Sequence, residues 1–133
     1  TTAGRYVHLD GVALDWPPSP PPPLLVGAMG DRTSALAGEI GDGVIFSEMS
    51  ADRVREATEH VREGRRSADV SRAPDVVVFH GVEGVLDAEP IAAEVREMMS
   101  AGATHVVLHV RDPAQPLEDA ARFVAEQLRP LLD

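Results

Sequence analysis

The residues best suited to binding a ligand follow the apolar run at positions 24–26. They are the turn Gly27-Ala28-Met29-Gly30 and, after one aspartate, Arg32 and Thr33. Small residues let a backbone approach a phosphate closely, and the first amides of a helix have no partner within it. Arginine and threonine side chains donate hydrogen bonds to phosphate oxygens. We therefore predict a phosphate site formed by Gly27, Ala28, Met29, Gly30, Arg32 and Thr33.

Two considerations oppose this prediction. The same small residues are typical of an ordinary tight turn without a ligand. Asp31, which lies between the turn and Arg32, places a negative charge beside the expected anion. The sequence does not decide between these readings.

Other polar residues at predicted strand ends are weaker candidates. His80 and His109 would form a proton shuttle or a metal site only if they converged, and two imidazoles are too few for a closed metal site. We expect surface or hydrogen-bonded histidines and no metal. Arg111 follows the last predicted strand and is suited to a phosphate, but pairing with Asp112 or solvent is the simpler expectation.

The remaining charged residues point to structural roles. Asp42 lies between two glycines and is predicted to form a turn. We expect solvated loop charge from three carboxylates, Glu48, Glu83 and Asp87, and a structural helix-end cluster from four arginines, Arg62, Arg65, Arg66 and Arg72. No catalytic residue is assigned.

The elements that must position these residues alternate regularly. Four short apolar runs at 24–26, 44–46, 76–79 and 105–110 predict strands, and each precedes a helical pattern, at about 32–40, 51–63, 90–101 and 117–128. Ser50 is predicted to cap the second helix and Gly64 to end it. Uninterrupted apolar strands are typical of parallel sheets with both faces buried. The fold class is therefore α/β.

The N-terminal region has a different character. Two short runs at 6–9 and 12–14 flank Asp10-Gly11, which predicts a small β-hairpin with its turn at that dipeptide. Prolines then dominate positions 17–23. We predict a hairpin over 1–16, a stiff connector over 17–23, and four βα units over 24–133, together forming a single domain.

Composition narrows the function classes. The net charge of −10 argues against nucleic-acid and anionic-lipid partners, and no segment resembles a membrane span or a signal peptide. The absence of cysteine excludes disulfides and thiol catalysis, and it is compatible with the cytoplasm. With 133 residues, the chain has about half of the roughly 250 that an eight-stranded α/β barrel uses. Because it starts with Thr1, we expect a portion of something longer.

The stretch PPPLLVGAMGDRTSALAGEIGDGVIF makes a resemblance specific. Its pattern is two prolines, an apolar strand, a small-residue turn, Leu36-Ala37-Gly38 in a helix, and Gly41-Asp42-Gly43 before the next strand. In this pattern, and in the tail AGATHVVLHVRD with FVAEQLRPLL, the chain resembles the luciferase-like monooxygenase family. That family comprises flavin-dependent and deazaflavin-dependent oxidoreductases on a TIM-type (β/α)8 barrel.

The resemblance implies the C-terminal half of such a barrel, with strands five to eight. The chain would help to hold the phosphate of FMN or coenzyme F420, while hydride transfer occurs mostly on the other half. Two departures concern the site: Gly30-Asp31 replaces a frequent Gly-Pro pair, and the connection at 81–89 is shorter than the family's helical insertion.

Half of a barrel leaves an apolar inner face and two unpaired edges. Cover could come from an N-terminal half-barrel, from a second copy in a homodimer, or from helices on both faces, and we favour another polypeptide. The main hypothesis is an oxidoreductase segment. The alternatives are a non-catalytic half-barrel for assembly or binding, and a phosphate-binding fragment of an isomerase-like or aldolase-like barrel.

Overall fold

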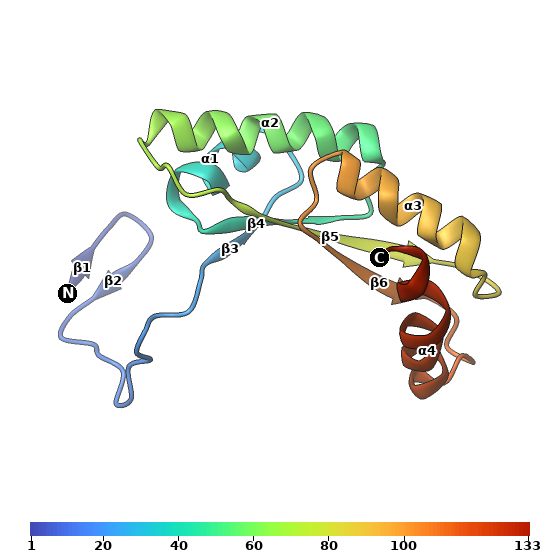
Figure 1. The fold of residues 1–133 in the computed structure, drawn as a ribbon. Helices are drawn as coiled ribbons and strands as arrows, with labels where there is room; N and C mark the ends of the chain where they lie inside the picture. The colour runs from blue at the N-terminus through green and yellow to red at the C-terminus, as the bar shows by residue number, and fades with distance from the viewer.

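The computed structural model describes residues 1–133 and contains four parallel strands in the order β3-β4-β5-β6 (Figure 1). The strands are Leu25–Gly27, Gly43–Ser47, Asp75–Val82 and His105–Val110. A helix follows each one: α1 (Asp31–Ile40), α2 (Ala51–Ser67), α3 (Ala88–Ser100) and α4 (Leu117–Phe123). The last helix continues as a π-helical turn, Val124–Leu128, and a 3-10 turn, Arg129–Leu131. The predicted succession of four βα units is confirmed.

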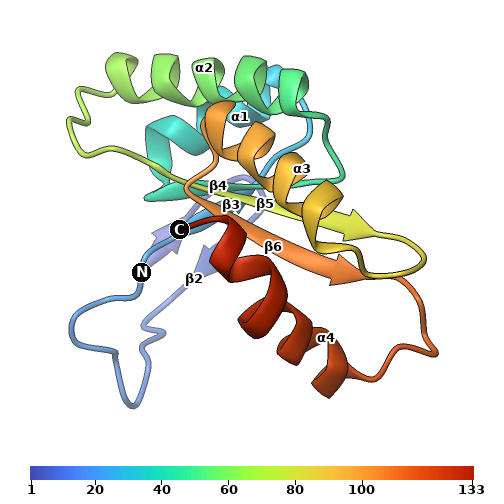
Figure 2. The same ribbon diagram turned by 45° about the vertical axis from the view of Figure 1, so that its right-hand side comes forward.

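The helices cover only one face of the sheet. Figures 1 and 2 show α1, α2 and α3 on the same side, and α4 packs beside α3 through Phe123 and Leu128. Strand side chains that point toward the helices, such as Phe46 and Val78, are fully buried. On the opposite face Phe79 is 37% and Val107 38% exposed. The expectation that both sheet faces are buried is therefore wrong for this chain, because no element lies over the second face.

A close contact between α1 and α2 organises the main core. A Cβ added to Gly38 would lie 2.0 Å from the carbonyl oxygen of Val61, and one added to Gly64 would lie 1.9 Å from that of Ala35. Only glycine allows the two backbones to approach this closely. Gly64 therefore lies inside α2, and the prediction that it ends this helix is wrong. The prediction for Ser50 is confirmed, since its Oγ accepts a 3.3 Å hydrogen bond from the amide of Arg53.

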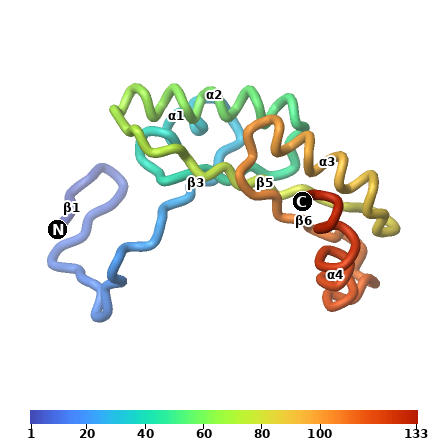
Figure 3. Tube along the Cα trace, viewed as in Figure 1, coloured from blue at the N-terminus to red at the C-terminus, as the bar shows by residue number.

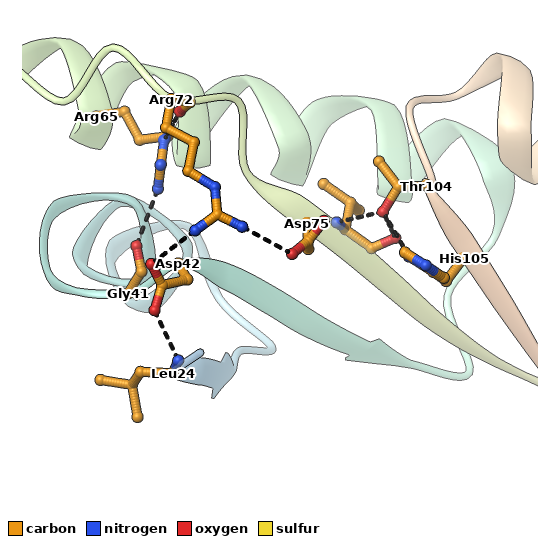
Figure 4. Close-up of polar contacts among 9 residues, drawn as sticks. Leu24, Gly41, Asp42, Arg65, Arg72, Asp75, Thr104 and His105 are labelled. Carbon is orange, nitrogen blue, oxygen red and sulfur yellow. Dashed lines mark hydrogen bonds and ion pairs between the residues drawn. The ribbon is translucent and has the colours of Figure 1, made fainter. Parts of the chain in front are cut away.

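Asp42 ties together the starts of three strands (Figure 4). Its Oδ2 accepts a 2.7 Å hydrogen bond from the Leu24 amide before β3, and its Oδ1 lies 3.3 Å from Nη1 of Arg72. Its carbonyl accepts from the amide of Asp75, the first residue of β5. Asp42 itself precedes β4, so its predicted turn-forming role is confirmed and extended to the neighbouring strands.

Arg65 anchors the end of α2 to the same rim (Figure 4). The side chain is buried, with Nε donating to the carbonyl of Arg72 at 2.7 Å and Nη1 to that of Gly41 at 2.9 Å. Because these are backbone acceptors, the guanidinium joins the loop after α1 to the loop after α2. The structural role expected for this arginine cluster is confirmed for Arg65 and Arg72.

The N-terminal hairpin differs from the predicted one. Strand β1 (Thr2–Ala3) pairs with β2 (His8–Leu9), and the amide of Gly4 donates to the carbonyl of Val7 across the turn. Gly11 has a positive φ of 62°, but its amide donates to the hydroxyl of Thr1 instead of closing a turn between paired strands. Figure 3 shows this segment running apart from the helices.

None of the helices combines the length and the apolar character that a bilayer crossing requires.

Replacement of Gly64 by alanine tests the helix contact. Alanine improves intrinsic helix propensity by about 1 kcal/mol. The new methyl group would force α1 and α2 apart, and we expect the free energy of unfolding to fall by about 1–3 kcal/mol, as for other overpacked sites. Urea unfolding measures this change. Gly27→Ala is the matched control, because a Cβ there meets no atom within 4 Å. Equal stability of Gly64→Ala and the parent chain would contradict the contact.

Candidate functional site

The predicted phosphate turn lies at the carboxyl end of β3. Gly27 ends the strand, and Ala28 is buried with its amide donating to the carbonyl of Ile45 at 3.1 Å. Met29 is exposed, and Gly30 is the N-cap residue of α1. No side chain caps the helix, so its first amides are not satisfied by a capping group.

The fold does not require glycine at this turn. A Cβ added to Gly27 or to Gly30 meets no atom within 4 Å, and neither residue has a positive φ. Gly38 and Gly43 are different, because a Cβ there would come within 2.0 Å and 2.3 Å of backbone oxygens. The two turn glycines thus leave open space directly over the backbone. A ligand group that must approach the main chain closely fits this space.

The charge of Asp31 is directed toward α2. Its Oδ1 lies 2.5 Å from Nη2 of Arg53, and its Oδ2 lies 3.8 Å from Nε2 of His60. The hydrogen bond from Arg53 holds the pKa of Asp31 below its ordinary value of 3.8. The carboxylate is therefore ionised but paired, which reduces the repulsion that it exerts on an anion at the turn.

Arg32 and Thr33 are exposed near the start of α1. With Leu36 and Glu39, they line a shallow depression on the outer surface of this helix. Neither side chain makes a hydrogen bond or an ion pair within the chain. None of residues 27–30 lines this depression, so the structure leaves Arg32 and Thr33 as free donors on the first turn of α1 without placing their side chains at the predicted phosphate turn.

A second polar group lies where β4, β5 and β6 end. Arg111 follows β6, and its Nη2 is 2.5 Å from Oε2 of Glu48, while its Nη1 is 2.7 Å from Oε1 of Glu83. Glu48 follows β4 and Glu83 follows β5. The expectation that Arg111 pairs with Asp112 is wrong, because Asp112 accepts a hydrogen bond from the amide of Ala114. Glu48 and Glu83 remain exposed, as expected for loop charges, but both are ion-paired, which the sequence did not predict.

Local backbone geometry supports this group. Glu48 has a positive φ of 56°, and its amide donates to the carbonyl of Phe79 at 3.0 Å. The hydrogen bond from Arg111 lowers the pKa of Glu48 below its ordinary value of 4.5, and the amide of Gly81 and the charge of His109 act in the same direction. The two carboxylate partners raise the pKa of Arg111. The charges of Glu48 and Arg111 therefore persist at neutral pH.

Sequence reasoning placed these residues on the correct edge but did not pair them. The available signal was the order of charges at successive strand ends, with an acid after β4, an acid after β5 and a base after β6. Because carboxyl ends of neighbouring parallel strands lie side by side, this order favours ion pairs across strands. The register required to prove it was not accessible from the sequence.

The two candidate histidines do not converge. His80 is paired with Leu108, and the next residue, Gly81, is paired with His109. Since side chains alternate along a strand, His80 and His109 lie on opposite faces of the sheet. Nε2 of His80 lies 2.7 Å from Oε2 of Glu94 on α3, under the helices. A shared metal or proton relay is excluded by this arrangement.

Comparison with known proteins decides the family. A family model described as luciferase-like monooxygenase matches residues 1–128 of the 133. This chain belongs to the luciferase-like monooxygenase family. The resemblance noted in the sequence is thereby confirmed. No protein of curated function matches it.

Solved structures share the fold of this luciferase-like chain. An F420-dependent secondary alcohol dehydrogenase in complex with an F420-acetone adduct has a TM-score of 0.84 at 17% identity, covering 100% of this chain and 56% of that protein. A coenzyme F420-dependent tetrahydromethanopterin reductase from Methanopyrus kandleri has a TM-score of 0.67 at 16% identity, covering 84% and 51%. The chain spans about half the length of each. The predicted half of a TIM-type barrel is confirmed.

We expect this luciferase-like chain to lose stability at acidic pH. In the folded chain the pKa values of Asp31 and Glu48 lie below their ordinary values of 3.8 and 4.5, which the unfolded chain retains. Their contribution is therefore complete above about pH 4.5 and is lost as the pH falls through the lowered values. We expect the melting temperature to decrease over this range. Circular dichroism at several pH values measures it.

A variant isolates the contribution of Glu48. We expect Glu48→Gln to lower the melting temperature at neutral pH and to show a shallower decrease on acidification than the parent chain. Glu126→Gln is the control, because Glu126 is exposed and forms no ion pair. Parallel pH curves for the parent and Glu48→Gln would contradict the ion pair.

Proposed function

We propose that this chain is the C-terminal portion of a luciferase-like oxidoreductase, acting by monooxygenation or by hydride transfer with FMN or coenzyme F420. Membership of the family supports this assignment, and both structural neighbours are F420-dependent by name. The chain contributes to the site of the cofactor phosphate. The bound cofactor supplies the redox chemistry, and the chain supplies groups that bind and orient it.

The observation that carries the proposal is the open backbone at residues 27–30. A cofactor phosphate needs close access to main-chain amides, and here two glycines keep that access free without serving the fold. Ala28 and Met29 form the rest of the turn, and Arg32 and Thr33 provide the adjacent donors. The pairing of Asp31 with Arg53 removes much of the electrostatic objection.

Cofactor titration tests this site. We expect Gly27→Val to weaken binding of FMN or coenzyme F420 at least tenfold, because the valine side chain occupies the space of the phosphate. Arg32→Ala and Thr33→Ala should each weaken it by roughly 5- to 100-fold, the range for one lost hydrogen bond to a charged group. Fluorescence titration measures the dissociation constants.

The matched control for the arginine is Arg55→Ala on α2. Arg55 is also exposed near a helix start, but its partner is Asp52, 2.5 Å away on the same helix. Its removal should leave cofactor affinity unchanged. Unchanged affinity in Gly27→Val, with a native circular dichroism spectrum, would refute the phosphate site.

A second function is favoured by the uncovered sheet face: a half-barrel for assembly or binding without redox activity. Phe79 and Val107 are exposed there, and the edge strands β3 and β6 each have a single neighbour. Covering even a few hundred Å² of apolar surface at roughly 25 cal/mol per Å² stabilises an assembly by several kcal/mol before ordering costs. The cover would be an N-terminal half-barrel or a second copy of this chain.

Sedimentation equilibrium tests the assembly. We expect the purified chain to exceed its monomer mass of 14.2 kDa, and Val107→Glu to shift it toward the monomer, because a charge on the buried face resists desolvation. Leu36→Glu is the control, since Leu36 is also an exposed apolar residue but lies on α1, on the helix side. If the folded parent chain remains monomeric, a second copy of this chain is excluded as the partner that covers the open sheet face.

A further inference from the structure

Arg111 is held on the uncovered face of the sheet by the absence of a side chain at Gly81. A Cβ built on Gly81 would lie 2.6 Å from Nε of Arg111 and 2.9 Å from both Cζ and Nη2. The guanidinium therefore lies across the backbone of Gly81. Val78 and Val82 on the same strand are buried under the helices, and Gly81 alternates to the opposite side. The guanidinium thus faces the inner side of the half-barrel.

The hydrogen-bonding edge of this guanidinium is already occupied. Nη2 binds Glu48 and Nη1 binds Glu83, so the two terminal nitrogens that would grip a phosphate or carboxylate together are already paired, and Nε lies against Gly81. The three side chains carry a net charge of −1, which further disfavours an anion. The role of Arg111 as a phosphate ligand, considered from the sequence, does not fit this geometry.

What remains available is the face of the guanidinium that points away from Gly81. The Arg111 side chain is 41% exposed although two carboxylates and one backbone segment hold it. A planar cation fixed in this way loses little conformational freedom when a flat conjugated ring stacks on it. It lies at the carboxyl ends of the strands, the end at which barrel enzymes bind their ligands.

We propose that Arg111 is a stacking platform for a planar conjugated ring, positioned by Glu48, Glu83 and Gly81. The inference rests on the proposed function, in which the ring is that of a flavin or deazaflavin. Arg111 reaches Glu48 at the end of β4, and β4 is the neighbour of β3, which carries the phosphate turn. Neighbouring strands lie about 5 Å apart, so one ligand can occupy both places.

The experiment compares FMN with riboflavin, which has the same ring and no phosphate. Two variants disturb the platform by different routes. Arg111→Lys keeps the charge but removes the planar group, and Gly81→Ala keeps the arginine but displaces it with a methyl group. Because the atoms that Gly81→Ala would meet belong to a flexible side-chain end, the fold should tolerate it. Circular dichroism confirms folding, and flavin fluorescence measures the dissociation constants.

We expect both variants to weaken the binding of riboflavin and of FMN by the same factor, roughly 3- to 30-fold, as for loss of one cation–π contact. The matched control is Arg55→Lys, another ion-paired arginine on the helix side of the sheet, which should change neither constant. The proposal is overturned if the variants leave riboflavin affinity unchanged, or if they weaken FMN alone, since that result assigns Arg111 to the phosphate. It is also overturned if the folded parent chain binds neither flavin.

Gly27→Val separates this proposal from the phosphate site. We expect this variant to weaken the binding of FMN and to leave the affinity for riboflavin unchanged. If Gly27→Val affects neither flavin while Arg111→Lys weakens both equally, the phosphate site fails and the platform stands. The reverse pattern removes the platform and retains the phosphate site.

Discussion

The fold depends on the packing of α1 and α2 onto one face of the sheet. Gly38 and Gly64 allow the two helices to approach within backbone contact, and the space beneath them is filled by valines of β4 and β5 and by Phe46 of β4. A second, smaller core joins α3 and α4 to the end of β5 and to β6. Both cores lie on the same side, so the chain achieves its stability without using the other face of the sheet.

Because of this one-sided packing, most residues that stabilise the fold are different from those that we associate with ligands. The residues that we associate with ligands, the turn at 27–30 and Arg111 with its two carboxylates, lie at the carboxyl ends of the strands, and of these only Ala28 belongs to a core. Two kinds of glycine mark the division. Those at the helix contact are required by neighbouring backbone, whereas those at the turn have open space above them. The distinction depends on contacts between distant segments.

The sequence predicted what is local or periodic. The apolar runs predicted the four parallel strands, and Ser50 predicted the start of α2. Predictions failed where a residue has a partner far away in the chain. Gly64 resembles a helix end but serves a contact with α1, and Asp10-Gly11 resembles a hairpin turn but follows β2. The partners of Arg111 lie 28 and more residues away, and only the strand register brings them together.

Asp42 has a consequence for how this scaffold can change. One carboxylate and one carbonyl fix the beginnings of β3 and β5, and buried Arg65 secures the loops around them. These anchors all belong to the rim opposite the proposed ligand. Loops on the ligand side can therefore be shortened, lengthened or grafted while these anchors stay in place, provided that the ion pairs of Arg111 with Glu48 and Glu83 are kept. A scaffold secured at one rim and editable at the other is a practical starting point for engineering new specificities.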